Sequence, residues 1–312
     1  MAPTRPRHVD ISAFQDLALF STAQAHDAAI SGHDLAALVR RELIWRPAPG
    51  WYSCRPDATD EERHVLRVAA NLRLLGDGAA ACRVSAVLLH GMPIARCDLA
   101  TVEIAVLGAG HGRTRRSVRV SEFAAKGADC RLIDVPLVGG RVRVVDPATA
   151  IVGMAAANSP SGALVAADHA VRHGLCTAAD LEEGLRARSG TRGVAAARRA
   201  LAHVDPRHES PGETLTAAVL RLGAWEYDPQ VWVRAGGRWY RLDFAVRGLK
   251  VAIEFDGEVK YTGPEVMQAQ LARQAALEAE GWVFVRIGWG DLDDPAILLG
   301  RVRDAVAVAG PA

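Results

Sequence analysis

Three carboxylates in the last third of the chain, Asp243, Glu254 and Asp256, are spaced so that a small sheet would bring them together. The apolar residues of 249–255 alternate, which is typical of a strand whose successive side chains point to opposite faces. One face would carry Val251, Ile253 and Phe255. Glu254 and Asp256 then share the other face at the end of the strand.

Asp243 lies on the preceding predicted strand and reaches the same place if the two strands pair through the short turn at Arg247 and Gly248. Three converging carboxylates disfavour one another's ionisation unless a cation neutralises them. Ligands that are all oxygen favour Mg²⁺, or Mn²⁺, over zinc. Such an ion can polarise a phosphodiester and lower the pKa of an attacking water. The sequence therefore predicts Asp243, Glu254 and Asp256 as metal ligands.

Lys260 is the candidate for a cationic catalytic group beside this site. Lysine is rare here, occurring only at 126, 250 and 260 among many arginines, and it supplies a compact point charge. The alternative is that Asp256 and Gly257 form an ordinary turn and that Lys260 is exposed surface. A turn does not explain Glu254, a carboxylate between two large apolar residues.

The elements around these residues follow a simple order. We expect a helix over 211–222, strands over 230–234, 239–246 and 249–255, a helix over 264–280, a strand over 282–287 and a final helix. The core order is αβββαβ.

At this point the chain resembles a known family. The stretches LDFAVRGLKVAIEFDGEVKY and LARQAALEAEGWVFVRIGWGDL resemble the small nuclease-like domains related to very short patch repair endonucleases, within the PD-(D/E)XK superfamily. The resemblance implies a restriction-endonuclease-like core, Mg²⁺ dependence and cleavage of DNA. It matches Asp243 to the first acid of the motif, Glu254 to the second, and Glu213 to a frequent auxiliary acid.

The chain departs from that pattern in two places. The superfamily's lysine would fall at 256, where this chain has Asp256, so the resemblance implies that Asp256 is a ligand and Lys260 a displaced lysine. Relatives often carry charged residues on the following helix where this chain has uncharged ones, while the auxiliary Arg273 is kept. The uncharged positions are Gln270, Leu271 and Gln274.

Residues 12–52 are typical of two short helices, 22–29 and 33–41, followed by a hairpin in ELIWRPAPGWYS. That order predicts a winged helix, a DNA-binding arrangement. An ordinary helical hairpin packed on the next domain is the alternative. The second helix and the wing would offer DNA the side chains of His33, Arg40, Arg41 and Arg46.

Residues 60–204 are typical of a mixed α/β connector. Its densest basic run, Arg113, Arg115, Arg116 and Arg119, could contact phosphates, although a solvated loop is an equal alternative. With the winged-helix-like start, the motifs SAVLLHGMPI, DPATAIVGMA and ALVAADHAVRHGLCTAADL resemble the AbiEi-type antitoxin family of type IV toxin–antitoxin systems. That resemblance implies operator binding by the winged helix and a toxin as partner.

Composition fits a multidomain globular protein of mixed class, α+β and α/β, with domains over 1–58, 59–206 and 207–312. The net charge of +1 is uneven: residues 205–312 hold 12 basic and 16 acidic residues, leaving 25 and 20 for the rest. The five cysteines lack zinc-finger spacing. With no apolar run long enough for a membrane span or a secretory signal, we expect a cytoplasmic protein.

Three functions follow as expectations. The first is a Mg²⁺-dependent DNA endonuclease in repair or defence, with DNA and a repair or toxin protein as partners. The second is a DNA-binding regulator or antitoxin with a degenerate nuclease domain. The third is an enzyme that acts on RNA. The oligomeric state is left open.

Overall fold

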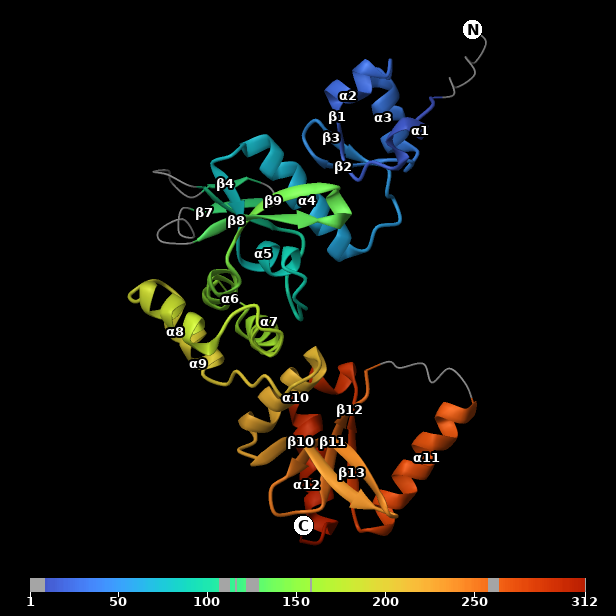
Figure 1. Cartoon of the computed structure of the whole chain (residues 1–312), viewed down its shortest axis with the longest axis vertical. Helices are drawn as coiled ribbons and strands as arrows, with labels where there is room; N and C mark the ends of the chain where they lie inside the picture. Colours follow the sequence, from blue (N-terminus) through green and yellow to red (C-terminus); the bar gives the residue numbers. More distant parts are fainter. Residues whose placement is uncertain are drawn as a thin grey trace. The chain divides into compact units, whose positions relative to one another are not determined.

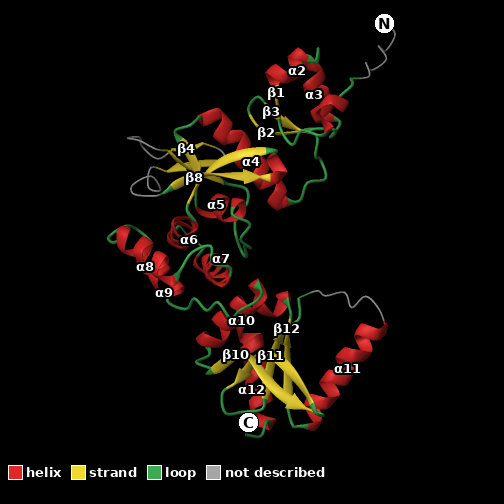
Figure 2. Cartoon of the chain, in the orientation of Figure 1, coloured by secondary structure: helices red, strands yellow, loops and turns green. Residues whose placement is uncertain are grey.

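The computed structural model describes residues 9–106, 113–115, 117–121, 129–157, 159–257 and 264–311. Within these ranges the protein is a mixed α/β chain of twelve α-helices and three open sheets (Figures 1 and 2). It divides into two compact units, the first comprising Met1–Ser159 with Ala179–Ala197 and the second Pro160–Ala178 with Arg198–Ala312. No helix in the described ranges has the length and apolarity to cross a membrane.

The first unit begins with short helices and a three-stranded sheet of order β1-β3-β2. These elements are α1 Ser12–Gln15, β1 Phe20–Ser21, α2 Thr22–Asp27, α3 Gly32–Arg40, β2 Trp45–Ala48 and β3 Trp51–Ser53. The predicted helix pair and hairpin are confirmed. Capping boxes begin α2 at Ser21 and α3 at Ser31, where each serine side chain accepts a bond from a first-turn backbone N–H.

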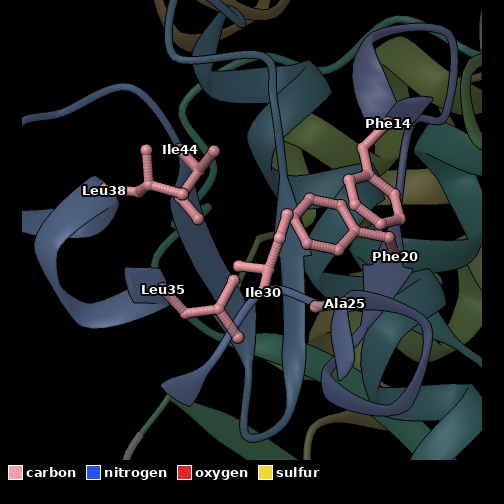
Figure 3. Packing of buried hydrophobic residues seen from close by; sticks show 7 residues of the cluster. All are labelled: Phe14, Phe20, Ala25, Ile30, Leu35, Leu38 and Ile44. Atoms are coloured by element: carbon pink, nitrogen blue, oxygen red, sulfur yellow. The ribbon is translucent and has the colours of Figure 1, made fainter. Parts of the chain in front are cut away.

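A small apolar core holds these elements together. Figure 3 shows its buried side chains converging from the helices and strands: Phe14, Phe20, Ala25, Ile30, Leu35, Leu38 and Ile44. The rings of Phe14 and Phe20 stack with centroids 4.3 Å apart. Since Leu35 and Leu38 turn one face of α3 inward, the opposite face, with His33 and Arg40, is exposed.

The rest of the first unit is built on a six-stranded mixed sheet of order β6-β7-β5-β4-β9-β8. Its strands are β4 Ala79–Ala81, β5 Val102–Val106, β6 Arg113–Arg115, β7 Val118–Ser121, β8 Cys130–Val135 and β9 Gly140–Val145. The helices are α4 Asp60–Leu75, α5 Arg83–Leu89, α6 Pro147–Ala156 and α8 Ala178–Ala187, whose first residue falls in the second unit. Helix α9, Val194–Leu201, runs from one unit into the other.

The second unit contains a four-stranded sheet of order β10-β11-β12-β13. Its elements are α7 Pro160–Arg172, α10 Pro211–Leu222, β10 Tyr227–Ala235, β11 Arg238–Val246, β12 Val251–Phe255, α11 Pro264–Ala279, β13 Val283–Ile287 and α12 Pro295–Val308. The first three strands are antiparallel, and β13 pairs parallel to β12. The predicted αβββαβ order is confirmed.

Helix α7 packs on α10 through a buried acid, a feature that the sequence did not indicate. The Asp168 carboxylate accepts bonds from the Thr214 hydroxyl, 2.8 Å, and from the backbone N–H of Asp205, 2.8 Å. His208 Nδ1 lies 2.7 Å from the same carboxylate, and both side chains are almost fully buried. A buried acid is tolerated only when it is bonded in this way, so the network fixes α7 to the second unit.

Both faces of the four-stranded sheet are covered. Leu277 of α11 packs on one face against Leu242 and Ala252, and Figure 1 shows α11 along that face, with α10 and α12 on the other. On the α10 side, Gly212 lies directly against the ring of Phe255. Because residue 212 is a glycine, α10 can pack closely against β12, the strand that carries Glu254.

We predict that Gly212→Ala destabilises the protein. A Cβ at residue 212 would lie 2.1 Å from the Phe255 ring, which packs edge-on against Trp289, so the ring or the helix would have to shift. Overpacking of this kind costs about 1–3 kcal/mol in the free energy of unfolding. Urea unfolding measures it.

Gly300→Ala is the matched control, because Gly300 lies within α12 and a Cβ added there would meet no atom within 4 Å. It should stabilise the protein by roughly 0.5–1 kcal/mol, since alanine is the better helix former. Equal unfolding free energies for Gly212→Ala and the native chain would contradict the packing described.

Candidate functional site

The structure brings the three predicted carboxylates into one pocket. Its volume is about 230 Å³, and its walls come from β11, β12, α11, β13 and the turn after β12: Asp243, Glu254, Phe255, Asp256, Gln270, Arg273 and Arg286. The pairing of Phe244 with Ile253 supplies the register that the sequence required. The predicted alternation along β12 is also confirmed, because Ala252 packs towards α11 and Phe255 towards α10.

Asp243 lies where the ladder between β11 and β12 ends. Its Oδ2 accepts a bond of 2.9 Å from the backbone N–H of Phe255, so a side chain replaces the backbone acceptor at this point. Glu254 immediately precedes Phe255 on β12 and lies directly opposite Arg286 of the parallel strand β13. Asp256 continues the chain beyond the strand, with its N–H donating to the carbonyl of Ile287 at 2.8 Å.

Arg273 of α11 is the main partner of Glu254. Its guanidinium forms an ion pair with both carboxylate oxygens, one contact being Nη1 to Oε2 at 3.1 Å. It also donates to the carbonyl of Arg241 at 2.9 Å. The side chains are only 18% and 12% exposed for Arg273 and Glu254, so solvent screens this bidentate pair weakly.

Asp243 has the most perturbed carboxyl of the pocket. Its pKa is raised from 3.8 to about 6, mainly by burial and also by the nearby charges of Glu213 and Glu254. The bond from the Phe255 N–H and the charge of Arg273 act in the opposite direction. Burial and neighbouring acids together therefore disfavour the ionised form of Asp243.

Three pocket residues, Phe255, Gln270 and Arg286, were not predicted as site residues. Arg286 sits in the strand motif VFVRIGW, but only the parallel pairing of β13 with β12 places it beside Glu254. It donates to the side-chain oxygen of Gln274 at 2.8 Å. The alternation of β13 could have indicated its face, but not its partner strand.

Glu213, the predicted auxiliary acid, is buried at the start of α10 and does not line the pocket. Its carboxylate accepts bonds from the Glu209 N–H, the Ser210 hydroxyl and the Gln230 amide, at 2.8 to 2.9 Å. It acts on the pocket through its charge, which raises the pKa of Asp243.

The remaining predicted residues are of two kinds. Lys260 and Arg116 fall outside the described residues, and of Arg113 and Arg115 only the backbone of β6 is described. The predicted DNA contacts of the α1–β3 segment are exposed: His33, Arg40, Arg41 and Arg46. None of these four lines the pocket.

The donor chemistry of the pocket suits a hard divalent cation, since Asp243, Glu254 and Asp256 offer only oxygen ligands. A bound cation would favour the ionised form of Asp243, against the burial and the neighbouring acids that raise its pKa. Within the described parts of the chain, however, no group of three or more His, Cys, Asp or Glu side chains is placed to hold a metal ion. Arg273 occupies both oxygens of Glu254, so a cation would have to compete with it.

Comparison with known proteins gives one group of relatives. Two Mycobacterium tuberculosis proteins, Uncharacterized protein Rv2248 of strain H37Rv and Uncharacterized protein MT2308 of strain CDC 1551, are each 30% identical to this chain over 269 residues. The match covers 83% of this chain and 93% of each relative. The chain belongs to their family. No protein-family model matches the sequence.

The raised pKa of Asp243 predicts a pH-dependent stability in EDTA. Because the folded state binds this proton more tightly than the unfolded state, the contribution is fully present below about pH 4 and is lost as the pH rises through about 6. Asp243→Asn cannot ionise, so at pH 7.5 it should be more stable than the native chain by up to about 3 kcal/mol. At pH 4 the gap should close.

Urea unfolding at several pH values measures this difference. Asp304→Asn changes an exposed acid of α12 and serves as the control, for which we expect no such gap. Parallel pH profiles for the native chain and Asp243→Asn would show that Asp243 ionises normally.

Proposed function

We propose that this protein is a Mg²⁺-dependent DNA endonuclease and that the pocket between β11, β12, β13 and α11 is its active site. The observation that carries the proposal is the convergence of Asp243, Glu254 and Asp256, from two adjacent strands and the following turn, in one pocket that also holds two arginines. The order αβββαβ, with β13 parallel to β12, supports a restriction-endonuclease-like core.

In this proposal each carboxylate has a role set by its position. Asp243 and Glu254 supply oxygens from neighbouring strands, and Asp256 supplies another from the turn. A bound Mg²⁺ would polarise the phosphodiester and lower the pKa of an attacking water. Asp243, whose pKa is already raised, can also hold or release a proton near neutral pH.

The arginines supply the complementary charge. Arg286 lines the pocket opposite Glu254 and can contact a phosphate oxygen of the substrate. Arg273 holds Glu254 in place until a cation takes over that carboxylate, after which its guanidinium is available to the phosphate. We assign to Lys260 the further cationic role that the sequence suggested.

The first unit would bind the duplex. We propose that its α1–β3 segment is a winged helix in which α3 enters the major groove and β2 and β3 form the wing. His33 and Arg40 lie two turns apart on the exposed face of α3, opposite the buried leucines, and Arg41 follows directly. Arg46 extends this basic surface onto β2.

A second candidate is a DNA-binding regulator or antitoxin whose second unit does not cleave. The observation that favours it is the bidentate pair of Arg273 with Glu254, which satisfies that acid without a metal. Gln270 and Gln274 add no charge to the same stretch of α11. This candidate predicts duplex binding that survives EDTA and leaves every substrate uncut.

A cleavage assay tests the proposal. The purified full chain is incubated with Mg²⁺ or Mn²⁺ and supercoiled, mismatched, branched and single-stranded DNA, with a single-stranded RNA arm for the third possibility. We expect cleavage of at least one DNA substrate, abolished by EDTA. Asp243→Asn should reduce the rate by at least about 100-fold, because charge stabilisation by a metal is worth several kcal/mol.

Asp304→Asn is the control for this assay and should cleave at the native rate, since it removes an exposed acid that does not line the pocket. Cleavage by Asp243→Asn at the native rate would contradict the proposed site. Duplex binding without cleavage of any substrate would favour the regulator.

A further inference from the structure

The hairpin of β10 and β11 carries two tryptophans whose side chains lie outside the core. Trp232 is 60% exposed and Trp239 is 64% exposed. The alternate residues Val231, Val233 and Tyr240 pack into the core on the α11 side of the sheet. The tryptophans therefore lie on the opposite face, because side chains alternate along each strand. Large exposed aromatic groups of this kind mark interaction sites.

Strand register arranges the exposed side chains in a regular pattern. Trp232 lies opposite Arg241, and Arg234 lies opposite Trp239, so each tryptophan has an arginine as its cross-strand neighbour. Trp232 and Trp239 are diagonal neighbours, a relation that places such side chains roughly 7–8 Å apart. The guanidinium of Arg241 lies over the Trp232 ring, 5.9 Å from its centroid, which restrains both side chains.

Between 230 and 241 the face of the hairpin with the tryptophans carries two arginines, Arg234 and Arg241, and no acid. Arg238 pairs with the buried Ala235 and so lies on the α11 side. Glu209 pairs with Arg241 at 2.7 Å, whereas Arg234 lies near the tip of the hairpin and is exposed. The Gly236-Gly237 turn, with both φ angles positive, gives a tight two-residue hairpin that holds the two strands in register.

We propose that this surface, defined by Trp232, Arg234, Trp239 and Arg241, binds unpaired nucleotides of a nucleic-acid strand. The indole rings would stack on exposed bases, and the guanidinium groups would contact the phosphates between them. Paired bases inside a duplex offer no free ring face for such stacking. The ligand is therefore a single strand, a frayed end or an unpaired segment.

Charge selects this ligand over a protein surface. Tryptophan and arginine also occur at protein interfaces, but a hairpin whose residues 230–241 include arginines and no acid complements a polyanion. Unpaired nucleic acid is then the substrate class of the second unit. This assignment rests on the proposed function, because the strand bound here would be the one that the pocket cleaves. The binding itself requires no metal.

Fluorescence anisotropy in EDTA tests binding apart from cleavage. The probes are labelled 20-residue oligo(dT) and oligo(rU) and a labelled duplex of mixed sequence, each titrated with the full chain. We expect oligo(dT), oligo(rU) or both to bind. Trp232→Ala with Trp239→Ala should weaken that binding at least about tenfold, since stacking on one aromatic side chain is worth that much or more.

Further variants separate the contribution of stacking from those of protein structure and of charge. Trp232→Phe with Trp239→Phe keeps an aromatic face and should retain most of the affinity. Arg234→Gln should flatten the dependence of log Kd on log salt by about 0.7 for one lost phosphate contact on a single strand. Arg40→Gln with Arg41→Gln, in the first unit, should weaken duplex binding and leave single-strand binding unchanged.

Several results would overturn the inference. One is the absence of binding to either single strand. Another is an affinity of the double alanine variant for single strands within twofold of that of the native chain. A loss of self-association in that variant, seen by sedimentation while single-strand binding is unchanged, would instead assign the surface to a second copy of the chain. Failure of cleavage in the earlier assay leaves this binding result intact, so the two proposals fail separately.

Discussion

The second unit depends on how a half-buried strand end tolerates three carboxylates. Glu254 is 12% exposed and Asp243 is buried enough for its pKa to rise to about 6, so their negative charge has little solvent to screen it. Arg273 of α11 neutralises Glu254 directly through a bidentate ion pair. Asp243 ionises only against burial and the charges of Glu213 and Glu254, which is the physical reason to expect a cation in this pocket.

This electrostatic arrangement also organises the fold around it. Arg273 lies one turn before Leu277 on α11, so the helix that packs on the sheet also delivers the guanidinium to Glu254. Its second bond, to the Arg241 carbonyl, ties the same helix to β11. On the other face, Gly212 lets α10 approach Phe255 closely. The carboxylates are thus held between two helices whose positions depend on single residues.

Much of this unit could be predicted from local patterns. The alternation in 249–255 gave the faces of β12, the Gly-Gly pair gave the hairpin turn, and the Ser-Pro start gave α10 with its observed bounds. These features succeed because each depends on a few neighbouring residues. The convergence of Asp243 with Glu254 also followed, because a short turn between antiparallel strands leaves few registers.

Features that depend on distant partners could not be predicted in the same way. Arg286 becomes a pocket residue only through the parallel crossover from β12 to β13. Strand β4, three consecutive alanines, has weak strand propensity and is a strand because its neighbours β5 and β9 bury it. The attachment of helix α7 to the second unit through Asp168 depends on bonds to residues some forty positions later.

Direct measurement of metal binding tests the central claim most sharply. Mn²⁺ titrated into the full chain and followed by electron paramagnetic resonance should show one bound ion, lost in Asp243→Asn. Binding should be tighter in Arg273→Gln, because that variant removes the guanidinium that competes for Glu254. Equal Mn²⁺ affinity in the native chain and Asp243→Asn, or no bound ion at millimolar Mn²⁺ in either the native chain or Arg273→Gln, would contradict the account.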